Sequence, residues 1–314
     1  MVTNFLIGFN AVMPMVLYMV LGQFFSRSKL VSQEAFSQFN RALFGILLPI
    51  NLFANVYNTN IAEDFDPDTL IYVLLYAVGI FIVSAIIVPL LEKDNRKRGV
   101  IVQGAIRSNA ILFGLPLGIS LLGEDNMGMV SIVLATIVPL NNILSVVALS
   151  IYSDAKLSLK QIGKNIITNP MVIFTLAGIL VQILNIQFPI FMETAMNNLS
   201  RMVSPLALLV MGGTFNFSKL KEAGWPLIGT VATKLVINPA IAFLIGGYVL
   251  GFRGASIVAI LIATAGPTAV SSFAQAEAAG GDGDLANQIV VFTTVLSMFT
   301  LVAWIFLLKT WGYF

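Results

Sequence analysis

The chain has 314 residues, of which 58% are hydrophobic and 10% are charged, with a mean hydropathy of +0.92; soluble domains carry roughly 25% charged residues. Neither cysteine nor histidine occurs, which excludes disulfides, thiol catalysis, zinc ligation through those side chains and acid–base catalysis by histidine. The net charge of +2 indicates little, because the side of a membrane on which charges lie matters more than their sum. We expect no nucleic-acid partner, no cofactor and no bound metal.

The apolar residues gather in segments long enough to cross a lipid bilayer as helices, which takes about 20 residues each. In chain order these segments cover about 5–25, 36–57, 70–91, 99–123, 128–152, 165–187, 199–216, 226–250, 255–278 and 286–308. The first has no basic n-region and no small-residue cleavage site, so we interpret it as a retained span and not as a signal peptide. We therefore predict an all-α polytopic membrane protein with ten transmembrane helices and no soluble domain.

Basic residues set the orientation of such a chain. If the N-terminus is outside, the cytoplasmic connections hold most of the 17 lysines and arginines, and the acidic stretch from Glu63 to Asp68 lies outside. The opposite orientation breaks this bias at nearly every loop. We predict a multi-pass protein of the cell membrane with both termini outside.

Ten spans divide into five and five, and an odd number per half gives the two halves opposite orientations, the design of inverted repeats. We predict a first five-helix repeat at 1–152, a cytoplasmic linker at 153–164 and a second five-helix repeat at 165–314. A proline match supports this division, because Pro49 in the second span corresponds to Pro205 in the seventh.

Two short glycine–proline breaks interrupt the fourth and ninth spans, Gly114-Leu115-Pro116 and Gly266-Pro267-Thr268. A break at bilayer depth survives only where protein or a water-filled cavity covers it, and paired breaks in two repeats point to the substrate site of a transporter. Proline suits the first position of a helix, so we expect the second half of each span to begin near Pro116 and Pro267. Two such helix starts, with their free N–H groups and positive dipole ends, would form an anion site.

Neutral hydrogen-bonding side chains flank both breaks. They are Ser108 and Asn109 before the first, and Thr264, Thr268, Ser271, Ser272 and Gln275 around the second. An organic carboxylate fits this set better than a metal ion or a sugar. The alternative, that both breaks only kink tightly packed helices, stays open.

Four stretches carry a resemblance to a known family: Asn109–Leu117, the Asn169-Pro170 opening of the sixth span, Pro267–Glu277 and Thr293–Ser297. They resemble the auxin efflux carrier family, which includes the plant PIN auxin exporters and bacterial carriers described as malate or malonate permeases. The resemblance covers essentially the whole chain. It implies an elevator-like secondary transporter whose fourth and ninth spans cross at their broken centres, with a mono- or dicarboxylate substrate, auxin-like or malate-like, held at the crossover.

The resemblance also implies a division into two parts. Spans 1, 2, 6 and 7 would form a scaffold, which could also mediate a homodimer, and spans 3, 4, 5, 8, 9 and 10 a transport bundle. By motif, Asn109, Gly114 and Pro116 would belong to the first crossover. With the flanking residues, the predicted substrate-binding set is Asn109, Gly114, Leu115, Pro116, Gly266, Pro267, Thr268, Ser271 and Ser272. The short link at 153–164 lacks the long hydrophilic loop of plant members, which argues against regulation by loop phosphorylation and against auxin itself.

Charged residues inside spans are functional candidates by default. Arg107 either pairs with the substrate or extends to the cytoplasmic surface. Lys234 either counters a carboxylate, replaces a coupling cation, or makes a structural pair. Glu277 is a candidate for proton or cation coupling, or a cap at the cytoplasmic end; we favour proton-linked or uncoupled transport over sodium coupling. Arg201 is assigned to the outer end of span 7, where it would reach the interface.

Four asparagines lie at depth, Asn51 and Asn55 in the second span and Asn141 and Asn142 in the fifth. They either line the site or form hydrogen bonds between helices.

Two other functions compete with transport by a carrier. The Gly281–Asp284 string contains the GxGD pattern of intramembrane aspartyl proteases, but that chemistry needs a second aspartate at membrane depth, and the other aspartates fall in predicted loops. A channel should show a polar stripe or charged rings along a pore, and a sensor an added signalling domain; the sequence shows neither. We therefore interpret the chain as a transporter and not as an enzyme.

Overall fold

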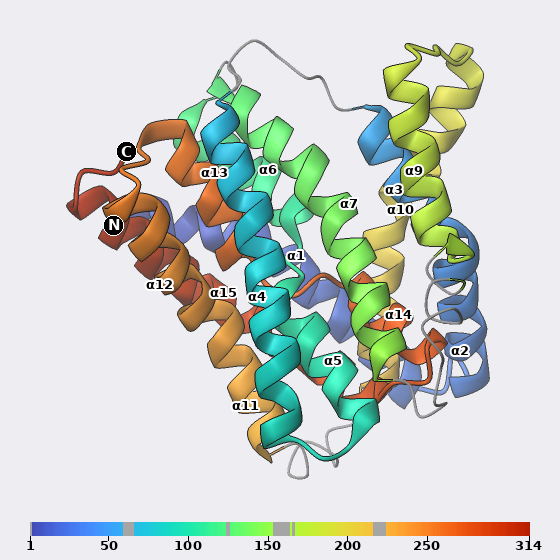
Figure 1. Cartoon of the computed structure of the whole chain (residues 1–314). Helices are drawn as coiled ribbons and strands as arrows, with labels where there is room; N and C mark the ends of the chain where they lie inside the picture. The colour runs from blue at the N-terminus through green and yellow to red at the C-terminus, as the bar shows by residue number, and fades with distance from the viewer. Residues whose placement is uncertain (1, 59–65, 124–125, 153–163, 165–166, 216–223) are drawn as a thin grey trace.

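The computed structural model describes residues 2–58, 66–123, 126–152, 164, 167–215 and 224–314, and these residues form a body of packed helices (Figure 1). In this part of the chain the one pairing of strand type is an isolated bridge between Ser108 and Thr268. The all-α prediction is confirmed for the described residues.

The helices of the first half follow the predicted apolar segments. They are α1 (Val2–Arg27), α2 (Gln33–Ala42), the π-helical η1 (Leu43–Leu47), α3 (Leu48–Tyr57), α4 (Pro67–Leu91), α5 (Asn95–Ile106), α6 (Ala110–Leu122) and α7 (Gly128–Ile151). Side-chain caps fix several starts: Ser32 accepts from the Ala35 N–H, and Asp66 and Asp94 cap α4 and α5 in the same way. Each cap satisfies one of the N–H groups that a helix start leaves unpaired.

The helices of the second half also follow the prediction. They are α9 (Pro170–Ile183), α10 (Ile190–Thr214), α11 (Gly224–Ala232), η4 (Thr233–Ile237), α12 (Asn238–Ala242), η5 (Phe243–Val249), α13 (Gly254–Ala265), α14 (Ser271–Ala278) and α15 (Gly283–Thr310). The π-helical turn η4 precedes Pro239, as η1 precedes Pro49. Proline cannot donate its backbone bond and clashes with the preceding turn, so the helix widens before it and continues.

Four helical stretches in the described part of the chain are long and apolar enough to cross a membrane: α4, α7, the continuous run Gly224–Val249, and α15. The fourth and ninth predicted spans are each divided into two helices too short to cross alone, of 12 and 13 residues (α5, α6) and of 12 and 8 residues (α13, α14). The arrangement of all ten spans as inverted repeats stays a prediction.

The position of the first break differs from the expectation. Helix α6 begins at Ala110, so Pro116 lies within the helix and not at its start. The break itself occupies Arg107 to Asn109, where the backbone is extended enough at Arg107 to pair with the other break. Pairing between the breaks therefore decides where the helix starts. In the ninth span the break itself is where predicted, because α13 ends before Gly266, but α14 begins at Ser271, so Pro267 lies within the break and not at the first position of the helix.

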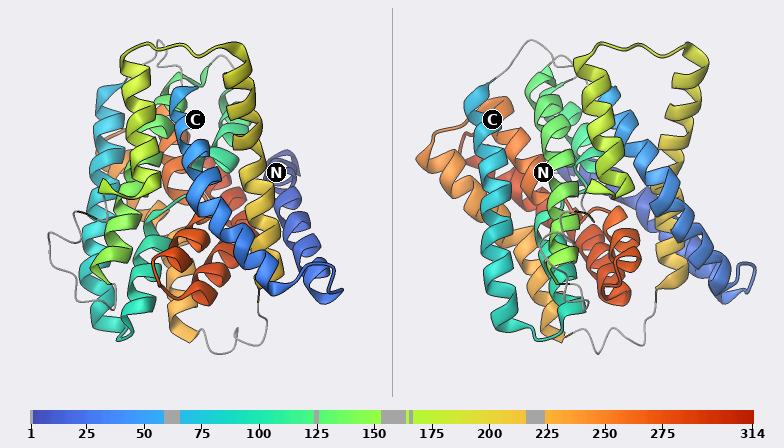
Figure 2. Two further views of the ribbon diagram at one scale, coloured as in Figure 1. Left: turned by 90° about the vertical axis from the view of Figure 1, so that its right-hand side faces the viewer. Right: turned by 45° about the vertical axis from the view of Figure 1, so that its right-hand side comes forward.

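The helices gather on two sides of the molecule. In Figure 1, α2, α3, α9 and α10 lie on the right, and α4, α11, α12, α13 and α15 lie on the left, with α7 between. Figure 2 shows α3, α9 and α10 together from other directions, and α3 packs against both α9 and α10. Helix α1 contacts α10 but also α15, so it touches both sides.

Glycines let α1 and α10 approach until their backbones touch. A Cβ atom on Gly22 would lie 1.9 Å from the Leu209 carbonyl oxygen, and one on Gly212 would lie 1.9 Å from the Met19 carbonyl oxygen. Between helices in lipid there is no hydrophobic driving force, so association depends on van der Waals packing. Small residues at such crossings allow the backbones to approach closely enough for it.

We expect Gly212→Ala to lower the melting temperature of the detergent-purified protein, because the added methyl group must separate the two helices, a cost of about 1–3 kcal/mol for overpacking. Gly79→Ala is the matched control, since a Cβ atom at Gly79 in α4 meets nothing within 4 Å. Equal melting temperatures for the two variants would contradict the close α1–α10 crossing.

Candidate functional site

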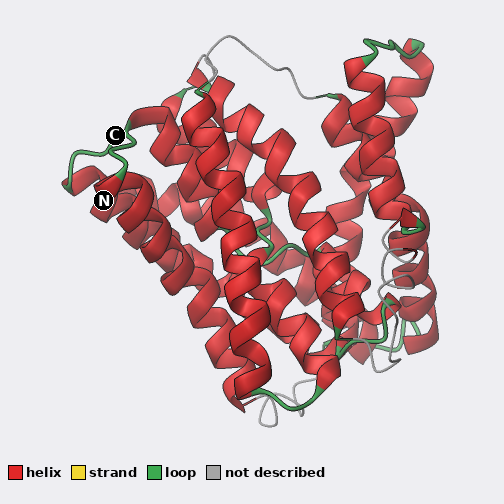
Figure 3. Cartoon of the chain, in the orientation of Figure 1, coloured by secondary structure: helices red, strands yellow, loops and turns green. Residues whose placement is uncertain are grey.

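The two breaks meet in the middle of the molecule and pair like two short antiparallel strands. The Asn109 N–H donates to the Pro267 carbonyl at 2.7 Å, and the Ala269 N–H donates to the Arg107 carbonyl at 3.2 Å. Figure 3 shows non-helical backbone of this kind inside the helical body. These bonds satisfy backbone groups that lipid could not satisfy.

Thr268 forms hydrogen bonds between the second break and two neighbouring helices. Its hydroxyl donates to the Gly104 carbonyl at 2.9 Å, and its backbone N–H donates to the Thr293 hydroxyl at 3.1 Å. The Thr268 side chain is fully buried. Thr268 therefore connects the break with α5 and α15.

Close packing also holds the broken spans together beside the crossover. A Cβ atom on Gly114 would lie 2.3 Å from Cγ2 of Ile262, so α6 and α13 pack more closely there than a side chain would allow. Gly114 thus serves packing between the two broken spans.

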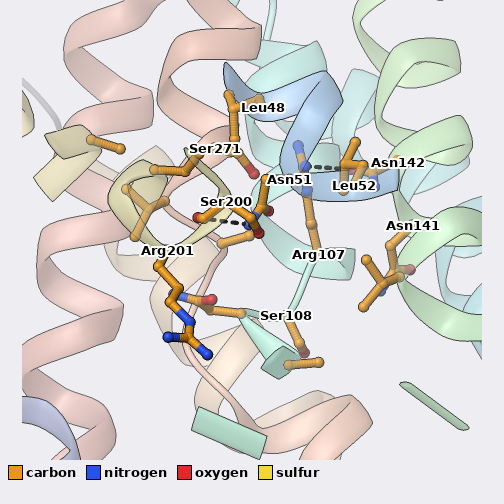
Figure 4. Close-up of a pocket in the computed structure, with 17 residues that line it drawn as sticks. Leu48, Asn51, Leu52, Arg107, Ser108, Asn141, Asn142, Ser200, Arg201 and Ser271 are labelled. Atoms are coloured by element: carbon orange, nitrogen blue, oxygen red, sulfur yellow. Dashed lines mark hydrogen bonds between the residues drawn. The ribbon is translucent and has the colours of Figure 1, made fainter. Parts of the chain in front are cut away.

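A cavity of about 270 Å³ opens beside the crossover (Figure 4). Its walls come from both breaks, from α3 and α10 on one side and from α7 on another. The residues that contribute polar groups are Asn51, Arg107, Ser108, Asn109, Asn141, Asn142, Ser200, Arg201 and Ser271. This volume lies just below the roughly 300–1,000 Å³ that ligand pockets occupy.

Arg107 places a buried positive charge at this cavity. The side chain is 3% exposed, and its guanidinium donates to Oε1 of Gln275 and to Oδ1 of Asn142. Both partners are neutral, and in the described residues no carboxylate pairs with Arg107. The alternative that Arg107 extends to the cytoplasmic surface is wrong, because its side chain is buried and its guanidinium is bonded to Gln275 and Asn142 inside the protein.

Two asparagine side chains at the cavity have amide N–H donors that are available to a ligand. Nδ2 of Asn109 and Nδ2 of Asn142 are buried and have no hydrogen-bond partner among the described residues. The orientation of Asn142 is set, because its Oδ1 accepts from Arg107. A buried donor without a partner costs free energy, so these amides are suited to a ligand that accepts hydrogen bonds.

The opposite wall combines a structural bond with a second cation. Nδ2 of Asn51 donates to the hydroxyl of Ser200 at 2.8 Å and joins α3 to α10. The next residue, Arg201, is exposed and lines the cavity. Helix α10 begins at Ile190, so Arg201 lies near the middle of the helix, and its assignment to the outer end of a span stays a prediction. The predicted seventh span began at residue 199, and so it placed Arg201 near an end.

Two further predicted residues lie away from the cavity walls. Lys234 is 1% exposed and donates to the Ser108 hydroxyl and to the Thr264 carbonyl. Glu277 is exposed at the end of α14 and accepts from Nδ2 of Asn40 in α2.

Of the predicted site residues, the structure thus places Asn109, Ser271 and Arg107 at the cavity. The Ser272 hydroxyl is buried without a partner in the described residues, but it is not part of the wall. Gly114, Gly266, Pro267, Thr268, Lys234 and Glu277 do not line the cavity either. The side chains of Leu115 and Pro116, like that of Asn55, lie outside the described residues.

A family model described as "Membrane transport protein" matches residues 7–305. The chain belongs to this family. A curated protein of Rhizobium meliloti (strain 1021), named "Putative malonate transporter", is 27% identical over 154 residues, which is 48% of this chain and 47% of that relative. The chain therefore spans about half the length of the relative it matches.

Membership of the membrane transport family confirms the resemblance read from the motifs, and it identifies the chain as a membrane transporter. The GxGD string lies at the start of α15, where Oδ1 of Asp282, its variable position, accepts from the Leu285 N–H at 2.9 Å and caps the helix.

The pairing of the breaks predicts that a disulfide can join them in this transporter. Ser108 and Thr268 face each other between two ladder bonds, the position where antiparallel Cα atoms are about 4.5 Å apart, within the range for a disulfide. Since the chain has no cysteine, Ser108→Cys/Thr268→Cys should form the bond under mild oxidation, detected by peptide mass spectrometry. Asn109→Cys/Thr268→Cys, one residue out of register, should form little, and equal yields would contradict the crossover.

Proposed function

We propose that the chain is a secondary transporter that carries a small organic carboxylate across the cell membrane and binds it in the crossover cavity. The observation that carries this proposal is the buried Arg107 guanidinium, which among the described residues is paired only with neutral groups, beside the Asn109 and Asn142 amide donors, which have no partner there. Family membership supports transport but leaves the substrate open.

The charge of Arg107 favours an anion. A buried cation without a counter-charge is strongly unfavourable, and charged residues at membrane depth normally pair or line an ion pathway. A carboxylate would supply the negative charge, and its oxygens accept several hydrogen bonds at once. The two asparagine amides provide donors for those oxygens, so substrate binding would satisfy three groups that the protein alone leaves unsatisfied.

Arg201 favours a substrate with two acidic groups. It lines the same cavity from α10, whereas Arg107 comes from the break between α5 and α6 (Figure 4). Two cations from different elements suit a ligand with two carboxylates. A cavity of about 270 Å³ also suits a short dicarboxylate better than a bulky aromatic acid. The name of the Rhizobium meliloti relative, a malonate transporter, agrees with this choice because malonate is a dicarboxylate.

An elevator-type motion accords with the position of the cavity. Its walls combine α3 and α10, which belong to the proposed scaffold, with the breaks and α7, which belong to the proposed transport bundle. We infer that the repeats at 1–152 and 165–314 provide two states of similar energy, with both termini outside. Polar contacts join the two parts: Asn40 to Glu277, and Nδ2 of Asn287 to the Met211 carbonyl at 3.0 Å.

Loss of the Asn109 amide should weaken carboxylate binding by about 1–3 kcal/mol, the usual cost of leaving a buried polar partner unpaired. The measurement is the rise in melting temperature of Asn109→Ala with malonate or malate, compared with the parent. Ser120→Ala is the control, because Ser120 is exposed on α6 outside the cavity. Parent-like stabilisation of Asn109→Ala by every acid that stabilises the parent would place the site elsewhere.

A cross-link between Asn40→Cys and Glu277→Cys should stop uptake into proteoliposomes, because it ties the scaffold to the transport bundle, and reduction should restore uptake. A short bis-methanethiosulfonate reagent suffices, since the parent side chains share a hydrogen bond, and its disulfide links to the two cysteines are broken by a thiol reductant. The control pair is Arg96→Cys/Asp282→Cys, whose backbones bond at 3.1 Å inside the proposed bundle. Uptake that survives the first cross-link, or is stopped equally by the second, would contradict the division into moving and fixed parts.

A further inference from the structure

Lys234 reaches the crossover from the side that does not face the substrate cavity. It lies in the π-helical turn η4 and is among the largest fully buried side chains of the described residues. Its ammonium donates to the Ser108 hydroxyl in the first break and to the Thr264 carbonyl, at 3.1 Å, near the end of α13. One charged group thus bonds to both broken spans at once.

The groups around this ammonium are those that suit a small cation. The last carbonyls of α13 have no partner within their helix and form its negative end. The Ser108 hydroxyl donates to the Ala263 carbonyl at 2.6 Å, so its lone pairs face Lys234. In transporters with broken helices, unwound carbonyls and the C-terminal ends of half-helices coordinate the coupling cation.

A second, very small cavity adjoins Lys234. Its volume is about 20 Å³, and its walls include Lys234, Thr264, Asn238 and Asn141. Space of this size holds about one water molecule. Oδ1 of Asn141 is buried without a partner in the described residues, and Asn141 also lines the substrate cavity. An oxygen with a free lone pair therefore stands between the Lys234 side and the substrate side.

We propose that the Lys234 ammonium is a built-in cation, which takes the place that a dissociable sodium ion would otherwise occupy behind the crossover. Its tether keeps the positive charge at the two breaks in every state, so the breaks stay joined without an ion from solution. Removal of the side chain would leave the Ser108 hydroxyl, the Thr264 carbonyl and the Asn141 amide oxygen around an enlarged cavity. Oxygen ligands of this kind are what hard cations prefer.

The proposal has two consequences. Shortening Lys234 should create a sodium site where the parent has none. Insofar as the proposed transport function holds, the parent should also move its substrate without sodium.

The test compares melting temperatures of the full-length protein in sodium chloride and in choline chloride at equal ionic strength. Lys234→Ala should gain a saturable rise with sodium, on the order of 2–4 °C. The parent should show none, and neither should Lys234→Met, which fills the same space without charge. Lys309→Ala controls for loss of a lysine, because Lys309 is exposed at the end of α15.

An equal response of Lys234→Ala to sodium and to choline would overturn the proposal. If this variant cannot be obtained folded in either salt, the parent decides the question: uptake, or stabilisation by carboxylate, that requires sodium would overturn the proposal, and sodium-independent behaviour supports it. Failure of every carboxylate to stabilise the parent would contradict the proposed substrate, while the sodium response of Lys234→Ala would still stand.

Discussion

The need to pair backbone groups at the two helix breaks is the constraint on which the rest of this structure depends. Neither break can be satisfied by lipid, and each supplies the partner of the other through the Asn109–Pro267 and Ala269–Arg107 bonds. This pairing fixes where α6 and α14 begin. It also leaves a space beside the crossover that α3, α7 and α10 do not fill. The pairing of the two breaks therefore produces a cavity with helix starts at its edge.

The two buried cations, one on each side of the crossover, have different tasks because their partners differ. Lys234 is bonded to a hydroxyl and a carbonyl of the fold. Arg107 is oriented by Gln275 and Asn142, side chains that direct a guanidinium without neutralising it. One charge therefore holds the crossover together, whereas the other stays available to a ligand in the cavity. The carboxylate of a substrate could act as a counter-ion of Arg107 that enters and leaves the cavity, which a carboxylate of the protein could not do.

The sequence predicted the helices and the existence of both breaks, because apolar length and glycine–proline pairs are local signals. It could not place the first break, since pairing with residues more than 150 positions away, and not Pro116, decides where α6 begins. Thr268 looked like a ligand-binding residue by its neighbours, yet its contacts with Gly104 and Thr293 depend on tertiary packing. The position of Arg201 within its helix was missed for a simpler reason. The polar first turns of α10 lowered the local hydropathy, so the predicted span began nine residues after the helix does.

The contacts between the proposed scaffold and bundle are compatible with motion because, in the part of the chain that the structure describes, few of them are polar. A hydrogen bond such as Asn287 to Met211 contributes only about 0.5–1.5 kcal/mol net, and the bond of Glu277 to the buried Asn40 is only partly buried, because the Glu277 side chain is exposed. By contrast, the crossover is held by backbone bonds, the buried Thr268 contacts and a buried ammonium. The strongest polar interactions thus lie within the proposed bundle and the weaker ones at its boundary, an arrangement that accords with the proposed motion of the bundle as a unit.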